Sequence, residues 1–78
     1  MTEKEKLQFS IGKRIREIRE NKAISQKDLA YSCGFDKSNM ARIEMGRTNP
    51  TIYTLKLIAD NLGTSICSIV EPNLSNNS

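Results

Sequence analysis

The sequence predicts an all-α fold of five short helices, and three observations lead to this prediction. Apolar residues recur every three or four positions through most of the 78 residues, which is the spacing of one face of an α-helix. Serine, threonine or aspartate precedes each of these stretches and glycine follows most of them, as expected at helix ends. No stretch shows the alternation of a β-strand. A compact bundle of helices is therefore expected.

The first helix is expected over roughly residues 6–20. Its apolar residues form one stripe, which consists of Leu7, Ile11, Ile15 and Ile18. Thr2 and Glu5 have the spacing of a capping box just before this helix. Asn21 and Lys22 end it. The charged residues of the segment lie mostly off the stripe, so we expect them to face outward.

Two shorter helices are expected next, separated by a turn at Gly34. Ser25 followed by Asp28 resembles a capping box, so the second helix begins near Gln26. Gly34 suits a left-handed helix end, which few other residues adopt at low cost. Asp36 is a good N-cap for the third helix. The inner residues expected from this pair of helices are Leu29, Ala30, Cys33, Phe35, Met40 and Ile43.

A fourth and a fifth helix are expected after a polar loop. Gly46 ends the third helix, and the loop then leads to Thr51, which is placed to cap the fourth helix. The fourth helix ends at Gly63. Ser65 starts a short fifth helix, which stops before Pro72. The apolar residues expected to face the core from these two helices are Leu55, Ile58, Ala59, Leu62, Ile66 and Ile69.

Length and composition predict one domain and one tail. A chain of 78 residues is near the size at which a single core is only just sufficient, so association between copies is expected. We expect residues 1–71 to fold as one domain and residues 72–78 to be a disordered tail, because the tail shows no periodicity. The 12 Lys and Arg against 9 Asp and Glu give a net charge of +3, which permits a nucleic-acid partner without requiring one.

The composition argues against catalysis. Histidine, the usual general base and the commonest metal ligand, is absent. Cys33 and Cys67 lie far apart and form no CxxC pair, so no metal site, redox motif or other cofactor is expected. The sequence also lacks a paired-carboxylate arrangement and a phosphate-cradling loop. We therefore do not expect an enzyme.

The chain is expected to be cytoplasmic. No apolar run approaches the roughly 20 residues that span a bilayer, and the charged start MTEKEK lacks the apolar segment of a signal peptide. We therefore expect no membrane partner and two reduced thiols. Because the residues suffice for only one small domain, no small-molecule ligand is expected either.

Residues from about 25 to 45 have the arrangement of a helix-turn-helix motif, two short helices joined by a tight glycine turn. The spacing Q-x3-A-x3-G-x5-M-x2-I is formed by Gln26, Ala30, Gly34, Met40 and Ile43. The small Ala30 lets the two helices cross closely. Met40 and Ile43 anchor the third helix inward. The side chains left pointing outward from the third helix are those of Lys37, Ser38, Ala41 and Arg42.

The sequence resembles the Cro/XRE-type helix-turn-helix proteins, the phage repressor-like DNA-binding domains. The matching segments, in order, are IGKRIREIRENKAISQKDLA, the turn Cys33-Gly34-Phe35, RIEMGRTNPT and TLKLIADNLGTS. Together they cover about residues 11–70. The resemblance implies a compact five-helix lambda-repressor-like domain. It also implies a dimeric, sequence-specific regulator of transcription that reads palindromic operator half-sites through the major groove.

The same resemblance assigns roles to individual residues. The positions implied to read bases are Lys37, Ser38, Ala41 and Arg42. The positions implied to contact the phosphate backbone are Gln26, Asn39, Gly46, Arg47, Thr48, Asn49, Thr51 and Tyr53. Arg19 and Glu44 match a family pair that forms an internal salt bridge between the first and third helices. We therefore assign this pair to structure rather than to DNA binding.

Double-stranded DNA and a second copy of the chain are the partners that the resemblance implies. The residues expected at the dimer interface are Cys67, Val70 and Leu74, although these side chains fit a simple cap on the monomer equally well. Phage repressors, antitoxins and restriction–modification controllers all have this compact size, and ARIEMGRTNPTIYTLKLIADNLG leans toward the controllers. The alternative function is that of an antitoxin or another protein-interaction module that uses the same fold.

Overall fold

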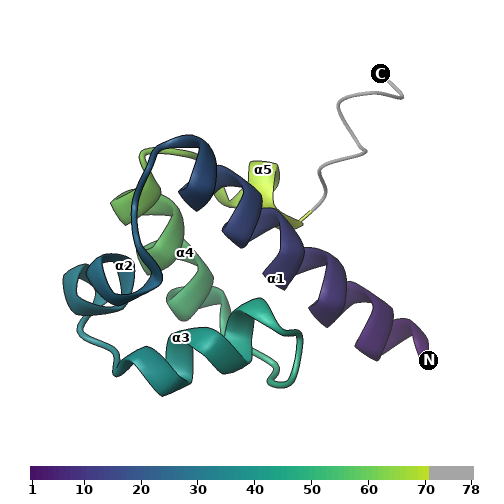
Figure 1. Ribbon diagram of the computed structural model, residues 1–78. Coiled ribbons are helices and arrows are strands. Elements are labelled where there is room, and N and C mark those ends of the chain that lie inside the picture. The colour runs from purple at the N-terminus through teal and green to yellow at the C-terminus, as the bar shows by residue number, and fades with distance from the viewer. Residues whose placement is uncertain (71–78) are drawn as a thin grey trace.

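The computed structural model describes residues 1–70, which form five α-helices (Figure 1). The helices are α1 (Glu3–Asn21), α2 (Gln26–Cys33), α3 (Lys37–Glu44), α4 (Ile52–Leu62) and α5 (Ile66–Val70). Residues 1–70 contain no strand, so the predicted all-α fold is confirmed. The expected domain end at residue 71 and the expected tail lie outside the described residues. Within the described part, no helix combines the length and the apolar character that a membrane span requires.

The helices pack into one bundle, and α3 lies on its surface. α1 packs against α3 and α5, while α2 packs against α3 and α4. Figure 1 shows α1 crossing the molecule, with its N-terminal turns extending beyond the other helices. α1 therefore supports the bundle with its C-terminal half and leaves its first turns largely uncovered.

The core forms where the inner stripes of the helices meet. Its buried residues are Ile11, Ile15, Ile18, Leu29, Ala30, Cys33, Met40, Ile43, Leu55, Ile58, Ala59, Leu62 and Ile69. These stripes were predicted from the sequence, and Ile66 and Phe35 pack against the core partly buried. Leu7 is the exception, because its side chain is 48% exposed. It lies one turn before Ile11, the first buried residue of α1.

α1 begins at Glu3, about one turn earlier than the apolar stripe predicts. The capping box is complete: the Glu5 amide donates to Thr2 Oγ1 at 3.1 Å, and the Thr2 amide donates to Glu5 Oε1 at 2.8 Å. The hydrogen bond from the Thr2 amide, followed by the interaction with the Thr2 side chain, lowers the pKa of the Glu5 carboxyl. The cap supports a first turn that has no core contacts of its own.

The turns after α1 and α2 share one geometry although only one of them contains glycine. Gly34 has a φ of 76°, and the Phe35 amide after it donates to the Ala30 carbonyl at 2.8 Å. Ala23 takes the same left-handed conformation with a φ of 56°. The Ile24 amide after it donates to the Arg19 carbonyl, five residues back, at 3.0 Å. The left-handed alanine was not predicted. In both turns the next residue, isoleucine or phenylalanine, packs against the core.

Candidate nucleic-acid interface

α3 turns a polar face away from the core. Met40 and Ile43 are almost fully buried on its inner side. The four positions expected to read bases occur at i, i+1, i+4 and i+5, so they share the opposite face. Three of them are exposed and the alanine is half-buried, and the set consists of Lys37, Ser38, Ala41 and Arg42. The structure therefore brings these side chains together on one accessible helix face.

Asp36 precedes α3 in the extended conformation of an N-cap residue, but its side chain makes no capping hydrogen bond. The predicted N-cap position is confirmed. By contrast, Ser25 Oγ accepts from the Asp28 amide at 3.0 Å. Thr51 Oγ1 accepts from the Thr54 amide at 3.1 Å. α2 and α4 thus begin at side-chain caps, whereas α3 begins without one.

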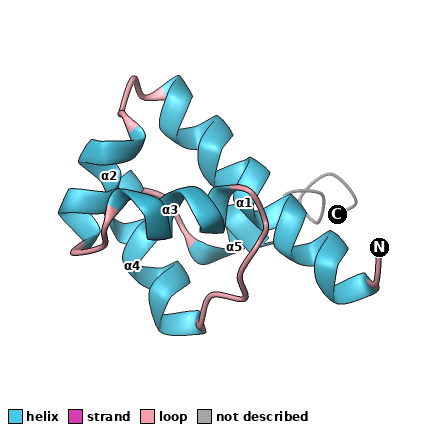
Figure 2. Ribbon diagram, turned by 60° about the horizontal axis from the view of Figure 1, so that its bottom comes forward, coloured by secondary structure: helices cyan, strands magenta, loops and turns pink. Residues whose placement is uncertain are grey.

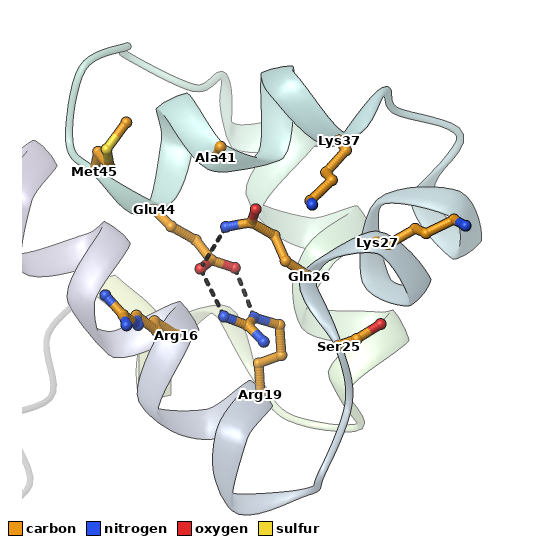
Figure 3. A pocket seen from close by; sticks show the side chains of 9 residues that line it. All are labelled: Arg16, Arg19, Ser25, Gln26, Lys27, Lys37, Ala41, Glu44 and Met45. Atoms are coloured by element: carbon orange, nitrogen blue, oxygen red, sulfur yellow. Dashed lines mark hydrogen bonds and ion pairs between the residues drawn. The ribbon is translucent and has the colours of Figure 1, made fainter.

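A buried ion pair fixes α3 to α1, as the family resemblance implied (Figure 3). Arg19 Nε donates to Glu44 Oε2 at 2.8 Å, and Arg19 Nη2 donates to Glu44 Oε1 at 3.0 Å. The two side chains are only 10% and 2% exposed. Arg19 Nη1 also donates to the Ile24 carbonyl at 2.9 Å. Both charges are therefore paired and hydrogen-bonded, which is the condition for tolerating them inside a protein.

Gln26 joins this pair from the start of α2. Its Nε2 donates to Glu44 Oε1 at 3.1 Å (Figure 3). The sequence did not predict this contact with Glu44. The glutamine side chain is consequently held between α2 and α3, at the edge of the exposed face of α3.

A hollow of about 450 Å³ lies between α1, α2 and α3 above the ion pair (Figure 3). It is lined by Arg16, Arg19, Ser25, Gln26, Lys27, Lys37, Ala41, Glu44 and Met45. The lining holds four cationic side chains and one carboxylate, and Arg19 already neutralises that carboxylate. An anion such as a phosphate group suits this charge balance. We call this space the α2–α3 hollow.

Arg16 and Lys27 line the α2–α3 hollow but were missed by sequence reasoning. Arg16 lies three residues before Arg19, and this spacing on a helix was the signal that could have placed it on the same face. Its Nε pairs with Glu20 at 3.2 Å on the surface. Lys27 directly follows Gln26, so its nearness to the hollow could also have been expected.

A second hollow of about 480 Å³ lies between the first turns of α1 and the loop after α3. It is lined by Thr2, Lys4, Glu5, Gln8, Arg47, Thr48 and Asn49. We call it the α1–loop hollow. Three of the expected phosphate-contacting residues therefore meet α1 residues that the sequence did not connect with them.

The remaining expected phosphate positions differ in their surroundings. Thr51 and Tyr53 are exposed, and Asn39 is half-buried. The Gly46 amide donates to the Ile43 carbonyl at 3.1 Å, so it already has a partner within the molecule. A side chain at Gly46 would also lie 2.7 Å from the Phe9 Cα. The structure thus gives Gly46 a packing role against α1.

The C-terminal region presents two of the three residues expected at a dimer interface. Cys67 is exposed, and Val70 is partly buried against the core. Leu74 lies outside the described residues. Arg14 Nε donates to the Ser68 carbonyl at 3.0 Å and ties α5 to α1, a contact that the sequence did not predict.

The other cysteine, Cys33, lies buried on α2, and burial raises the pKa of its thiol.

The five-helix fold, in which α2 and α3 are joined by the turn at Gly34, has the architecture of the helix-turn-helix class. Residues 15–69 match the helix-turn-helix family HTH_3, and the chain belongs to this Cro/XRE-type family.

Comparison with known proteins gives the same class. The chain is 36% identical over 62 residues to the immunity repressor protein of Bacillus phage phi105, a match covering 80% of this chain and 43% of the repressor. The biofilm master regulator SinR, solved in complex with DNA, is 34% identical with a TM-score of 0.73, covering 78% of this chain and 98% of that chain. A mutant of the restriction–modification controller C.Esp1396I is 31% identical with a TM-score of 0.77, covering 91% and 90%.

Proposed function

We propose that this chain is a sequence-specific, dimeric regulator of transcription that reads palindromic operator half-sites with α3 in the major groove. The observation that carries the proposal is the single outer face formed by Lys37, Ser38 and Arg42, flanked by two hollows with cationic linings. The major groove, about 12 Å wide, admits a helix and displays a distinct donor and acceptor pattern for each base pair. Arg42 and Lys37 can donate to guanine there.

Phosphate contacts on both sides of α3 fix its register on the duplex in this proposal. Gln26 contributes on one side, and Arg47, Thr48 and Asn49 contribute on the other. The bond between Gln26 and Glu44 supports this role, because a side chain that is already held loses little freedom on binding. Asn39, Thr51 and Tyr53 extend the same backbone contacts. Ala41 is placed to touch a thymine methyl group.

Dimerisation supplies a second recognition helix, which reads the second half-site. One recognition helix reads only a few base pairs, and two-fold dimers of this motif bind half-sites about 34–36 Å apart. We propose that Cys67 and Val70 on α5 contribute to the interface. The named relatives, a phage repressor and a restriction–modification controller, support a regulatory role at an operator.

Replacing Arg42 tests the reading face. Arg42→Ala should lower affinity for the preferred operator by about 1–3 kcal/mol and relax the preference at one base pair per half-site. Binding to random duplex DNA should fall much less. Titrations of wild type and variant against both DNAs measure this difference. Equal losses on both would show that Arg42 contacts phosphate and reads no base.

Selection of bound sites from random DNA, followed by sedimentation of the complex, tests the whole proposal. We expect a palindromic site, two chains per duplex and a steep loss of affinity with salt. A chain that selects no site and shows no salt-dependent DNA binding, yet captures a protein partner, would favour the antitoxin or protein-interaction alternative.

A further inference from the structure

Four residues of α1 lie on one stripe that passes beneath the end of α3. Lys4, Gln8, Gly12 and Arg16 are spaced by four positions and therefore form one row, which winds gradually around the helix. At Gly12 a Cβ atom would lie 2.4 Å from the Ile43 carbonyl oxygen. The C-terminal end of α3 thus rests directly on the middle of the stripe.

The stripe emerges on both sides of this crossing. Figure 2 shows the C-terminal end of α3 in front of the middle of α1, with α1 visible on both sides of it. On one side Arg16 lines the α2–α3 hollow. On the other side Lys4 and Gln8 line the α1–loop hollow together with Arg47. Polar side chains of α1 therefore lie on both sides of the crossing, Arg16 beside residues of α3 and Lys4 and Gln8 beside the loop that follows α3.

The cations of the stripe are available to an anion. Within residues 1–70 Lys4 forms no ion pair. Arg16 pairs only with the exposed Glu20, and surface pairs are worth at most about 1 kcal/mol, so a phosphate can replace this partner. The Glu5 carboxylate also lines the α1–loop hollow and keeps its negative charge, because the Thr2 amide that donates to it at 2.8 Å is neutral. Two cationic side chains, those of Lys4 and Arg47, outnumber it there.

The stripe is longer than the width of the groove that α3 would occupy. Lys4 and Arg16 are 12 residues apart, which corresponds to about 18 Å along a helix, whereas the major groove is about 12 Å wide. A helix of this length reaches the phosphates on both sides of the groove. We propose that α1 is a third DNA-contacting element, in which Lys4, Gln8 and Arg16 bind backbone phosphates on either side of α3. This inference rests on the proposed function and extends it.

Charge-removing variants of exposed residues test the inference. Lys4→Gln and Arg16→Gln should each weaken binding to operator and to random duplex by the same factor. Each should also reduce the slope of log affinity against log salt by about 0.9, the value for one lost phosphate contact. Lys6→Gln is the matched control, because Lys6 lies on the same helix, pairs with Glu3 at 3.6 Å and lines neither hollow. The control should leave both affinity and slope unchanged.

The conservative variants Lys4→Arg and Arg16→Lys should restore the wild-type slope, since they restore the charge. The inference is overturned if either Lys4→Gln or Arg16→Gln has the same affinity and slope as Lys6→Gln. A wild-type chain that does not bind duplex DNA would instead overturn the proposed function, so the two failures are distinguishable.

Discussion

Gly12 shows how one residue sets the position of α3. It lies in the interior of α1, where glycine weakens a helix by about 1 kcal/mol relative to alanine. Its missing side chain allows the backbone of α3 to approach, since a Cβ there would lie 2.4 Å from the Ile43 carbonyl oxygen and 2.5 Å from that of Glu44. Those neighbours are backbone atoms, which cannot turn aside as a flexible side chain does.

Gly12→Ala should therefore destabilise the protein by about 3 kcal/mol, the upper part of the range for overpacking, despite the gain in helix propensity. Gly34→Ala provides the comparison. No atom lies within 4 Å of its added Cβ, so only the left-handed φ of 76° is unfavourable, at about 1–2 kcal/mol. Urea unfolding of both variants measures the difference. A Gly12→Ala protein more stable than wild type would mean that α1 and α3 cross at a greater distance.

At the scale of elements, Arg19, Glu44 and Gln26 connect α1, α3 and α2 through hydrogen bonds of 2.8 to 3.1 Å. Within residues 1–70 no buried side-chain nitrogen or oxygen lacks a partner, so this polar cluster is fully satisfied. The cluster holds the two helices of the motif at a defined angle on α1. Its removal should affect stability before sequence preference.

Glu44→Ala should cost about 3–5 kcal/mol, because it leaves the Arg19 charge buried and unpaired. In a domain of this size each kcal/mol lowers the melting temperature by about 4–8 °C. Asp60→Ala is the control: it breaks the Lys56–Asp60 pair of 2.6 Å, whose side chains are 59% and 54% exposed, and should cost at most about 0.5 kcal/mol. Thermal unfolding followed by circular dichroism compares the two. Unchanged stability with lost operator binding in Glu44→Ala would instead assign Glu44 to DNA recognition.

At the scale of the whole molecule, the proposed dimer can be examined through an exposed residue on α5. Cys67→Arg would place two positive charges at a two-fold interface and should shift the protein toward monomers in sedimentation equilibrium. Tyr31→Arg is the matched control, because Tyr31 is 86% exposed on α2 and the same charge is added far from α5 along the chain. A dimer that persists equally in both variants would place the interface elsewhere. A wild type that sediments as a monomer at all concentrations would exclude dimerisation.

Most of the fold followed from local patterns. The isoleucine stripe of α1, the Ser25 cap and the Gly34 turn depend on residues within a few positions of each other, so the sequence shows them directly. The left-handed conformation of Ala23 was missed because alanine does not favour it, so the residue type gives no signal. The conformation brings Ile24 against the core, which depends on tertiary packing. Leu7 was misplaced because periodicity does not show where the neighbouring helices end.

The sequence by itself determined the helix order, the inner stripes and the polar residues of α3, because helix periodicity and end preferences are properties of short segments. Family resemblance also predicted the Arg19–Glu44 pair, which the structure contains. Only the tertiary structure decided that Gln26 bonds Glu44, that Gly12 is the crossing point of α1 and α3, and that Arg16 and Lys4 line hollows on the two sides of this crossing. These features depend on how closely and at what angle separate helices pack, which no local pattern encodes.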